Sequence, residues 1–289
     1  MPTRFTFTAR DGVEITAYRW SPDGPPRAVL QITHGMGEHV LRYGGLADAL
    51  TARGVAVYGQ DHRGHGASVG TGGLGVIGPT GWDELVHDVD LLVGLARAEN
   101  PGVPLVLLGH SMGSFAVQQY LAGHSDRVSA AALTGTAAID LLETSLDLDS
   151  PLDLTMFNGP FAPARTDYDW LSRDEEQVDR YVADPLCGFG LDVPGVKGMF
   201  AAARPLSDPT RMALVRSDLP LYIAVGEDDP VNGQLMLFNV LAGRYRGAGV
   251  TDLTLNSYPG ARHEILNETN RDEVVADLAE WVDRVVDQA

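Results

Sequence analysis

The chain has 289 residues, of which 44% are hydrophobic, and its formal net charge is -18 at pH 7. This length is enough for one large α/β domain or two small ones, and the negative charge opposes binding to nucleic acid or to an anionic membrane surface. The single cysteine, Cys187, excludes an internal disulfide and a thiolate metal cluster and is typical of a reducing compartment.

No apolar run reaches the length of a membrane span, and the first residues lack the apolar core of a signal peptide. We therefore expect a cytoplasmic protein without stable membrane insertion.

The first half of the chain alternates between strand and helix patterns. Residues 4–20 alternate apolar and polar side chains around Asp11 and Gly12, which predicts a two-stranded hairpin. Further strands are predicted at 28–33, 55–60, 104–108 and 129–135, and helices at 41–53, 82–98 and 114–121. On helix 82–98 we expect Glu84, Asp88 and Asp90 to form a solvated face. This alternation indicates an α/β fold, with a mostly parallel sheet and helices on both faces.

The alternation stops after residue 138 and resumes with a strand at 221–225. A helix at 234–242, a strand at 251–258 and a final helix with one apolar face, 274–285, complete the chain. We therefore predict a core of residues 1–138 and 219–289 and a cap inserted at 139–218.

The predicted cap is Pro-interrupted and rich in leucine. Its first part alternates leucines with Asp147, Asp149 and Asp153, and short helical patterns follow at 175–182, 196–203 and 209–215. An insertion at this point of the sheet covers the carboxyl ends of the strands, where ligands bind in this architecture.

The pentad Gly-His-Ser-Met-Gly at 109–113 lies between a predicted strand and a predicted helix. A sharp turn there holds Ser111 out above the sheet and needs nearly side-chain-free neighbours, which Gly109 and Gly113 provide. At the N-terminus of the helix, the backbone N–H of Met112 points toward an oxyanion formed on an attacked carbonyl. The pentad therefore predicts a serine nucleophile.

A serine nucleophile needs a base and an acid to orient it, in the order serine, acid, histidine for this architecture. Of the eight histidines, His263 alone lies beyond the predicted cap, in the loop between the last strand and the last helix. The acid is expected in the loop 226–231, where Asp228 and Asp229 compete and spacing does not separate them. Asp140 is a weaker third candidate.

The second oxyanion donor is expected in the loop 34–39, after the first parallel strand. Glycines on both sides of Met36 allow its backbone to approach a ligand, so the N–H groups of Met36 and Met112 are the predicted pair.

Two other patterns do not support a cofactor or metal site. Residues 70–75 match G-x-G-x-x-G, but no strand runs into them and no helix follows directly, so we expect a flexible loop. Four histidines lie in two separate loops without the spacing of a metalloenzyme, and we expect capping and loop hydrogen bonds for them instead. These are His34, His39, His62 and His65.

Six further features of the sequence belong together. They are H-G-M-G-E-H at 34–39 with Arg42 and Tyr43, D-H-R-G-H-G-A-S at 61–68, the pentad at 109–113, L-S-R-D at 171–174, Tyr181, and D-P-L at 184–186. Together they resemble the monoacylglycerol lipase and lysophospholipase-like family of α/β-hydrolases. The resemblance spans nearly the whole chain and implies the α/β-hydrolase fold.

The resemblance also implies residue roles. The family's acid is the fourth residue of a G-x-x-D turn, which selects Asp229, and its oxyanion donors correspond to Met36 and Met112. The cap resembles a lipophilic cap that shelters an acyl chain. Glu38, Arg42 and Tyr181 would lie near a glycerol-like head group, or would form a structural ion pair and a packed tyrosine.

The sequence thus predicts a serine hydrolase without cofactor, in which Ser111, His263 and Asp229 cleave carboxylic esters of single-chain neutral lipids. The density of aspartates in the cap keeps an alternative open, a general carboxylesterase or small amidase that acts on a polar substrate. A catalytically silent receptor is a third hypothesis, and fluorophosphonate labelling of Ser111 would exclude it.

Overall fold

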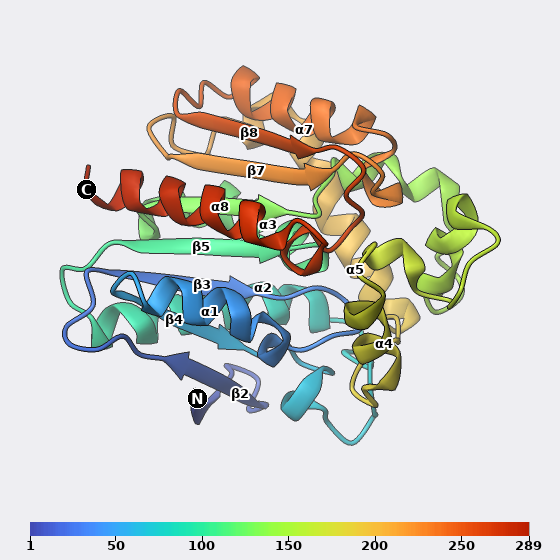
Figure 1. Ribbon diagram of the computed structural model, residues 1–289, viewed down its shortest axis with the longest axis horizontal. Helices are drawn as coiled ribbons and strands as arrows, with labels where there is room; N and C mark the ends of the chain where they lie inside the picture. The colour runs from blue at the N-terminus through green and yellow to red at the C-terminus, as the bar shows by residue number, and fades with distance from the viewer. Residues whose placement is uncertain (289) are drawn as a thin grey trace.

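The computed structural model describes residues 1–288, which form one eight-stranded sheet (Figure 1). The strands are β1 (Thr3–Thr8), β2 (Glu14–Trp20), β3 (Ala28–Thr33), β4 (Val55–Gln60), β5 (Leu105–His110), β6 (Ala130–Thr134), β7 (Leu221–Gly226) and β8 (Leu253–Tyr258). Their order across the sheet is β1-β2-β4-β3-β5-β6-β7-β8. The pairs β1–β2 and β2–β4 are antiparallel and all others are parallel, so the predicted hairpin and mostly parallel sheet are confirmed.

Helices cover both faces of the sheet. They are α1 (Gly44–Thr51), α2 (Gly81–Glu99), α3 (Met112–His124), α4 (Glu175–Ala183), α5 (Val193–Ala203), α6 (Pro209–Met212), α7 (Met236–Gly247) and α8 (Arg271–Val286). Apolar side chains of α2, α3 and α7 pack on one face, and those of α1 and α8 pack on the other. The central strands β3, β4 and β5 are buried on both sides, as their β-branched and leucine-rich sequences require.

Residues 139–218, which we predict to form a cap and call the cap below, lie between β6 and β7. Figure 1 shows this segment gathered at the ends of the parallel strands to which the arrowheads point, with α4 and α5 at its inner side. Its first part contains short 3-10 turns rather than α-helix, among them η6 (Leu154–Phe161). The helical pattern expected at 209–215 forms only the four-residue α6, which begins at Pro209. Within residues 1–288, no helix is both long and apolar enough to cross a membrane.

The expected solvated face of α2 is wrong for two of its three residues. Asp88 is 1% exposed and accepts hydrogen bonds from the Arg63 guanidinium at 2.8 and 3.1 Å, and Glu84 is buried against Arg10. Helical periodicity in the sequence indicates which side of a helix is polar. It cannot indicate that an arginine from a distant segment covers that side. Burial raises the pKa of Asp88 to about 6, and Arg63 opposes the rise.

Candidate active site

Ser111 lies at the tip of a strained turn between β5 and α3. Its backbone has φ 50° and ψ -124°, a left-handed conformation that is costly for a residue with a side chain. A Cβ on Gly109 would lie 2.7 Å from the carbonyl oxygen of Gly113, and a Cβ on Gly113 would lie 2.0 Å from that of Thr33. Both glycines are therefore required for the strand and helix to approach this closely.

His263 and Asp229 meet at the carboxyl ends of β8 and β7. The Nδ1 of His263 lies 2.9 Å from the Oδ2 of Asp229, and both side chains are almost fully buried. The other carboxylate oxygen, Oδ1, accepts the backbone N–H of Val231 at 2.9 Å. Asp228, the competing aspartate, is exposed to solvent, and Asp140 instead pairs with Arg244 at 2.6 Å.

This environment sets the protonation of His263. Burial lowers its pKa, but the negative charge of Asp229 and the hydrogen bond to it raise the pKa, and the net shift is upward. With Nδ1–H donated to the carboxylate, the neutral ring presents Nε2 as a proton acceptor.

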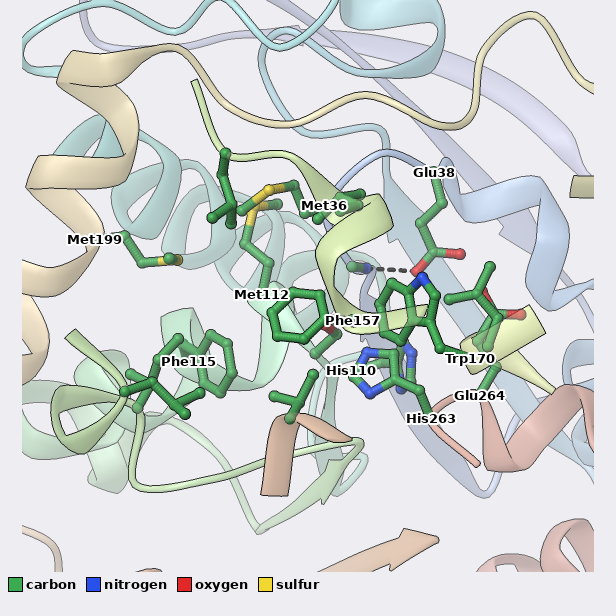
Figure 2. Close-up of a pocket in the computed structure, with 18 of the residues that line it drawn as sticks. Met36, Glu38, His110, Met112, Phe115, Phe157, Trp170, Met199, His263 and Glu264 are labelled. Atoms are coloured by element: carbon green, nitrogen blue, oxygen red, sulfur yellow. Dashed lines mark hydrogen bonds between the residues drawn. The ribbon is translucent and has the colours of Figure 1, made fainter. Parts of the chain in front are cut away.

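Two aromatic rings hold the ring plane of His263, and backbone hydrogen bonds to the cap hold its loop. Its ring centroid lies 4.8 Å from that of Trp170 and 5.0 Å from that of His110. Figure 2 shows His263 between these two side chains, at the edge of the cavity that Ser111 also lines. The N–H groups of His263 and Glu264 donate to the carbonyl oxygens of Trp170 and Leu171 at 3.4 and 2.7 Å. The cap therefore helps to hold the loop that carries the base.

The loop after β3 brings Met36 close to the serine. A Cβ on Gly35 would lie 2.7 Å from Oε1 of Glu38 and 3.2 Å from the Cβ of Ser111, so a larger residue here would need both side chains to shift. Met112 is the first residue of α3, and its N–H therefore has no acceptor within the helix. Both predicted oxyanion donors thus belong to segments that border the same cavity as Ser111.

His34 orients the peptide between Gly35 and Met36, and Glu38 holds the peptide that precedes it. The N–H of His62 donates to Nε2 of His34 at 3.0 Å, so the proton of the neutral ring lies on Nδ1, which donates to the carbonyl of Gly35 at 2.8 Å. The carboxylate of Glu38 accepts the N–H of Gly35 at 2.6 Å. Because C=O and N–H of one peptide point in opposite directions, holding the Gly35 carbonyl also fixes the direction of the Met36 N–H.

The residues predicted near a head group form a buried ionic cluster. Arg42 donates to Glu38 at 2.6 Å and, through two nitrogens, to Glu264 at 2.5 and 2.7 Å. Its guanidinium carbon lies 4.8 Å above the ring of Tyr181, and Tyr43 donates to Glu38 at 2.7 Å. This arrangement matches the alternative of a structural ion pair and a packed tyrosine. It also joins the loop of Met36 to the loop of His263.

One cavity connects these groups. It contains about 610 Å³ of space outside protein atoms, part of which is open to solvent. Its polar lining residues are Glu38, His110, Ser111, Tyr181, His263 and Glu264. The remainder is mostly apolar and comes from α3, from α5 and from the first part of the cap; Figure 2 shows Met36, Met112, Met199 and Phe115 around this portion. The side chain of Arg42 is not among the described residues that line the cavity.

The alternation of leucine and aspartate in the cap separates the two surfaces of this segment. Leu142, Leu146, Leu152 and Leu154 line the cavity. Asp147, Asp149 and Asp153 are exposed on the outside. Asp149 pairs there with Lys197 at 2.5 Å, and Asp153 caps η6 through the N–H of Thr155. The acidic residues thus belong to the solvent face, and the cavity wall is hydrophobic.

The sequence did not identify Trp170, Phe115 or Met199 as part of the site. Phe115 lies one turn into α3, where its helical position alone already places it near Ser111. Trp170 directly precedes the L-S-R-D stretch, which is the signal that could have marked it. Met199 gives no such signal, because its role depends on how α5 packs over α3.

The geometry is suited to acyl transfer. A strained serine, a buried imidazole oriented by a carboxylate, and backbone N–H groups beside the serine border a cavity whose lining is mostly apolar. Nucleophilic attack on a carbonyl carbon requires these groups together.

Comparison with known proteins gives consistent results. The family described as serine aminopeptidase, S33, matches residues 24–270. A monoacylglycerol lipase from Mycolicibacterium smegmatis is 33% identical over 287 residues, 96% of this chain and 95% of the relative. Human monoglyceride lipase is 31% identical over 276 residues, 89% of this chain and 82% of the relative. A thermostable carboxyl esterase from Bacillus coagulans, solved in complex with glycerol, has a TM-score of 0.88 at 24% identity over 99% of both chains, which shows a common fold.

Proposed function

This chain belongs to the family described as serine aminopeptidase, S33, and is a carboxylic ester hydrolase with the α/β-hydrolase fold; we propose that its substrates are monoacylglycerols with medium or long acyl chains. One observation carries the proposal: the cavity beside Ser111 has a hydrophobic portion built largely by the cap and a polar side that includes Glu38 and Glu264. A single acyl chain with a small polar head group has the same division.

In the proposed reaction, Ser111 Oγ attacks the ester carbonyl while His263 Nε2 takes its proton. Asp229 holds the imidazole in the tautomer that accepts this proton and stabilises the imidazolium. The N–H groups of Met36 and Met112 bind the oxyanion. His263 then protonates the leaving alcohol, and water attacks the acyl-enzyme to release the fatty acid and restore Ser111.

We place the glycerol moiety at the polar end of the cavity, near Glu38 and Tyr181. Both residues line the cavity, which supports this placement. The carboxylate of Glu38 is already engaged by Gly35, Arg42 and Tyr43, so its main contribution is to hold the oxyanion loop. Arg42 contributes in the same way, because it bridges Glu38 and Glu264 behind the cavity wall.

The alternative, a general esterase or small amidase for a polar substrate, rested on the cap aspartates. Their position on the outer surface removes this support, since Asp147, Asp149 and Asp153 do not face the bound acyl group in the proposed complex. We also propose that the enzyme is cytoplasmic, which the single cysteine supports because it is typical of a reducing compartment.

The proposal is tested with a substrate panel. Monoacylglycerols of increasing chain length, short aryl esters and aminoacyl arylamides are compared with the purified protein. We expect the highest kcat/KM for a medium-chain or long-chain monoacylglycerol. Hydrolysis of the aryl esters without hydrolysis of any such monoacylglycerol would overturn the substrate assignment.

The nucleophile is tested separately. We expect a fluorophosphonate to label the wild type and the control variant Ser207→Ala, which changes an exposed serine. Ser111→Ala should be neither labelled nor active. Labelling of Ser111→Ala at the wild-type rate would refute the assignment of the nucleophile.

A further inference from the structure

Three side chains that commonly bind metals converge where the loop after β3 touches the cap. His39 lies in this loop, and Asp184 and Cys187 lie in the turn that follows α4. The ring nitrogen, the carboxylate oxygen and the sulfur all lie within 4.8 Å of one another. None of the three is among the described residues that line the catalytic cavity, and the proposed reaction gives them no task.

Backbone hydrogen bonds organise the turn that carries two of these groups. The carbonyl of Asp184 accepts the N–H of Cys187 at 3.0 Å, and its side-chain Oδ1 accepts the N–H of Leu186 at 2.8 Å. The second carboxylate oxygen, Oδ2, lies 2.9 Å from Nε2 of His39. The carboxylate, thiol and imidazole are thus held together before any ion binds, which lowers the ordering cost of binding.

We propose that His39, Asp184 and Cys187 form a zinc-binding site, with water as the fourth ligand. Imidazole nitrogen, carboxylate oxygen and thiolate sulfur are the ligands that Zn²⁺ takes in proteins, at about 2.0–2.3 Å in tetrahedral geometry. The ion replaces the proton between Nε2 of His39 and Oδ2 of Asp184. That proton moves to Nδ1 through solvent, and the Cys187 thiol releases one proton, so that one proton leaves for each zinc ion bound.

Asp184 supplies the negative charge of the site itself. The positive charge of Arg42 also acts on the sulfur of Cys187 and opposes a cation there, and the carboxylates of Glu38 and Glu264 counteract it. Arg42 is itself neutralised by Glu38 and Glu264 through short ion pairs. Asp184 is 31% exposed in its side chain, which leaves a path for an ion from solvent.

Zinc at this site would connect two segments that are distant in sequence. The N–H of Gly188 already donates to the carbonyl of Gly37 at 3.0 Å, so the turn and the loop are in contact. Zinc would replace the contact between His39 and Asp184 with bonds from one ion to His39, Asp184 and Cys187, which brings Cys187 into the connection. Zinc binding should therefore raise the midpoint of thermal unfolding, independently of whether the enzyme hydrolyses monoacylglycerols.

The experiment uses the full chain without a polyhistidine tag, stripped of metal with a chelator. Zn²⁺ is titrated in competition with a chromophoric chelator, and Co²⁺ is used as a spectroscopic substitute. Because Cys187 is the single cysteine of the sequence, a thiolate-to-cobalt charge-transfer band in the wild type identifies its ligand without any variant. The variants are Cys187→Ser, Asp184→Asn and, as a control, His124→Gln, which removes an exposed histidine elsewhere.

We expect one zinc ion per wild-type chain, a charge-transfer band with Co²⁺, and a rise in unfolding temperature. Cys187→Ser should abolish the band and weaken zinc binding by at least about a hundredfold, more than the roughly 10–100-fold typical of losing a partner that only orients a ligand. Asp184→Asn should also weaken binding, and His124→Gln should not. A wild type that binds no zinc at micromolar concentration, binds Co²⁺ without the band, or matches Cys187→Ser in zinc affinity would overturn the proposal.

Discussion

Asp229 and Asp228 are adjacent in one loop, and exchanging each for asparagine tests the proposed orientation of the base. In the wild type, the N–H of Val231 donates to Oδ1 of Asp229 at 2.9 Å, and in Asp229→Asn this N–H still needs an oxygen acceptor. The asparagine oxygen therefore takes that position, and the new NH₂ group replaces Oδ2 opposite Nδ1 of His263. Two donors cannot face each other, so the imidazole must change tautomer and place its proton on Nε2.

The cost of this change follows from the mechanism. An imidazole protonated on Nε2 cannot take the proton of Ser111, and the same substitution in a serine-histidine-aspartate triad lowers kcat by about 10⁴. A factor of 10⁴ corresponds to about 5.4 kcal/mol of lost transition-state stabilisation. Asp228 is exposed, and its backbone N–H to the carbonyl of Ala261 survives substitution, so Asp228→Asn should stay within about twofold of the wild type.

The assay is steady-state hydrolysis of one monoacylglycerol from pH 5 to 9. In the wild type, His263 must be neutral, so activity falls as pH decreases through its raised pKa. Without the carboxylate, burial dominates and lowers that pKa, so the acid limb of Asp229→Asn moves to lower pH while its maximum falls. Equal losses in the two variants, or an Asp229→Asn loss smaller than tenfold, would refute the reasoning.

Three further predictions concern the oxyanion loop, the cavity and acid stability. His34→Leu removes the N–H that holds the Gly35 carbonyl, so kcat should fall about 10–100-fold with little change in KM. This is less than the roughly 10²–10³-fold loss on removal of an oxyanion donor itself. His34→Asn, whose amide can reach the same carbonyl, should restore part of the lost kcat, and equal rates for the two variants would contradict this role. Leu146→Trp should reduce the kcat/KM of a long-chain monoacylglycerol relative to a short-chain one at least tenfold in a chain-length series, because Leu146 lines the cavity. Burial lowers the pKa of four histidines, His34, His62, His65 and His110. In the unfolded chain these histidines have a pKa of about 6.5, so their buried neutral form contributes its full stability above that pH. Below it, each of them lowers the free energy of unfolding by about 1.4 kcal/mol per pH unit until its own folded-state pKa is reached. Urea unfolding at pH 7 and 5.5 measures this decrease, and equal stability at the two pH values would contradict it.

Local sequence was sufficient to predict those parts of the structure that depend on residues close together in the chain. The strands, the helices of the core and the strained turn at Ser111 follow from hydrophobic period, glycine placement and helix-start position, and the structure has them within a few residues of the predicted bounds. The residues expected to form a triad also lie at the predicted strand ends, and the spacing ambiguity between Asp228 and Asp229 corresponds to one exposed and one buried carboxylate.

Contacts between segments that are distant in the chain could not be predicted from local sequence. Nothing in the sequence around Arg42 indicates that it bridges Glu38 to Glu264, more than 200 residues away. The same holds for Asp88. The helical pattern around it predicted a solvent-exposed side chain, but in the structure it pairs with Arg63 from another loop. Burying such a charge is costly unless its partner is present, so these positions depend on the completed fold.

The cap depends both on its local sequence pattern and on contacts with distant segments. Its alternation of leucine and aspartate suggested a surface that was not purely lipid-facing, and this mixture left the substrate class open. The stretch between η5 (Glu143–Ser145) and η6 is irregular, and in it Leu146 and Leu152 line the cavity. The aspartates of this stretch are exposed on the outside, where Asp149 pairs with Lys197. The same sequence can therefore give the cavity a hydrophobic wall and the molecule an acidic surface. It follows that neutralising the pair Asp149 and Lys197 together should leave the chain-length preference unchanged, whereas Leu146→Trp should alter it. The preference for an acyl chain thus depends on the inner residues of the cap, and the net charge of -18 depends in part on the outer ones.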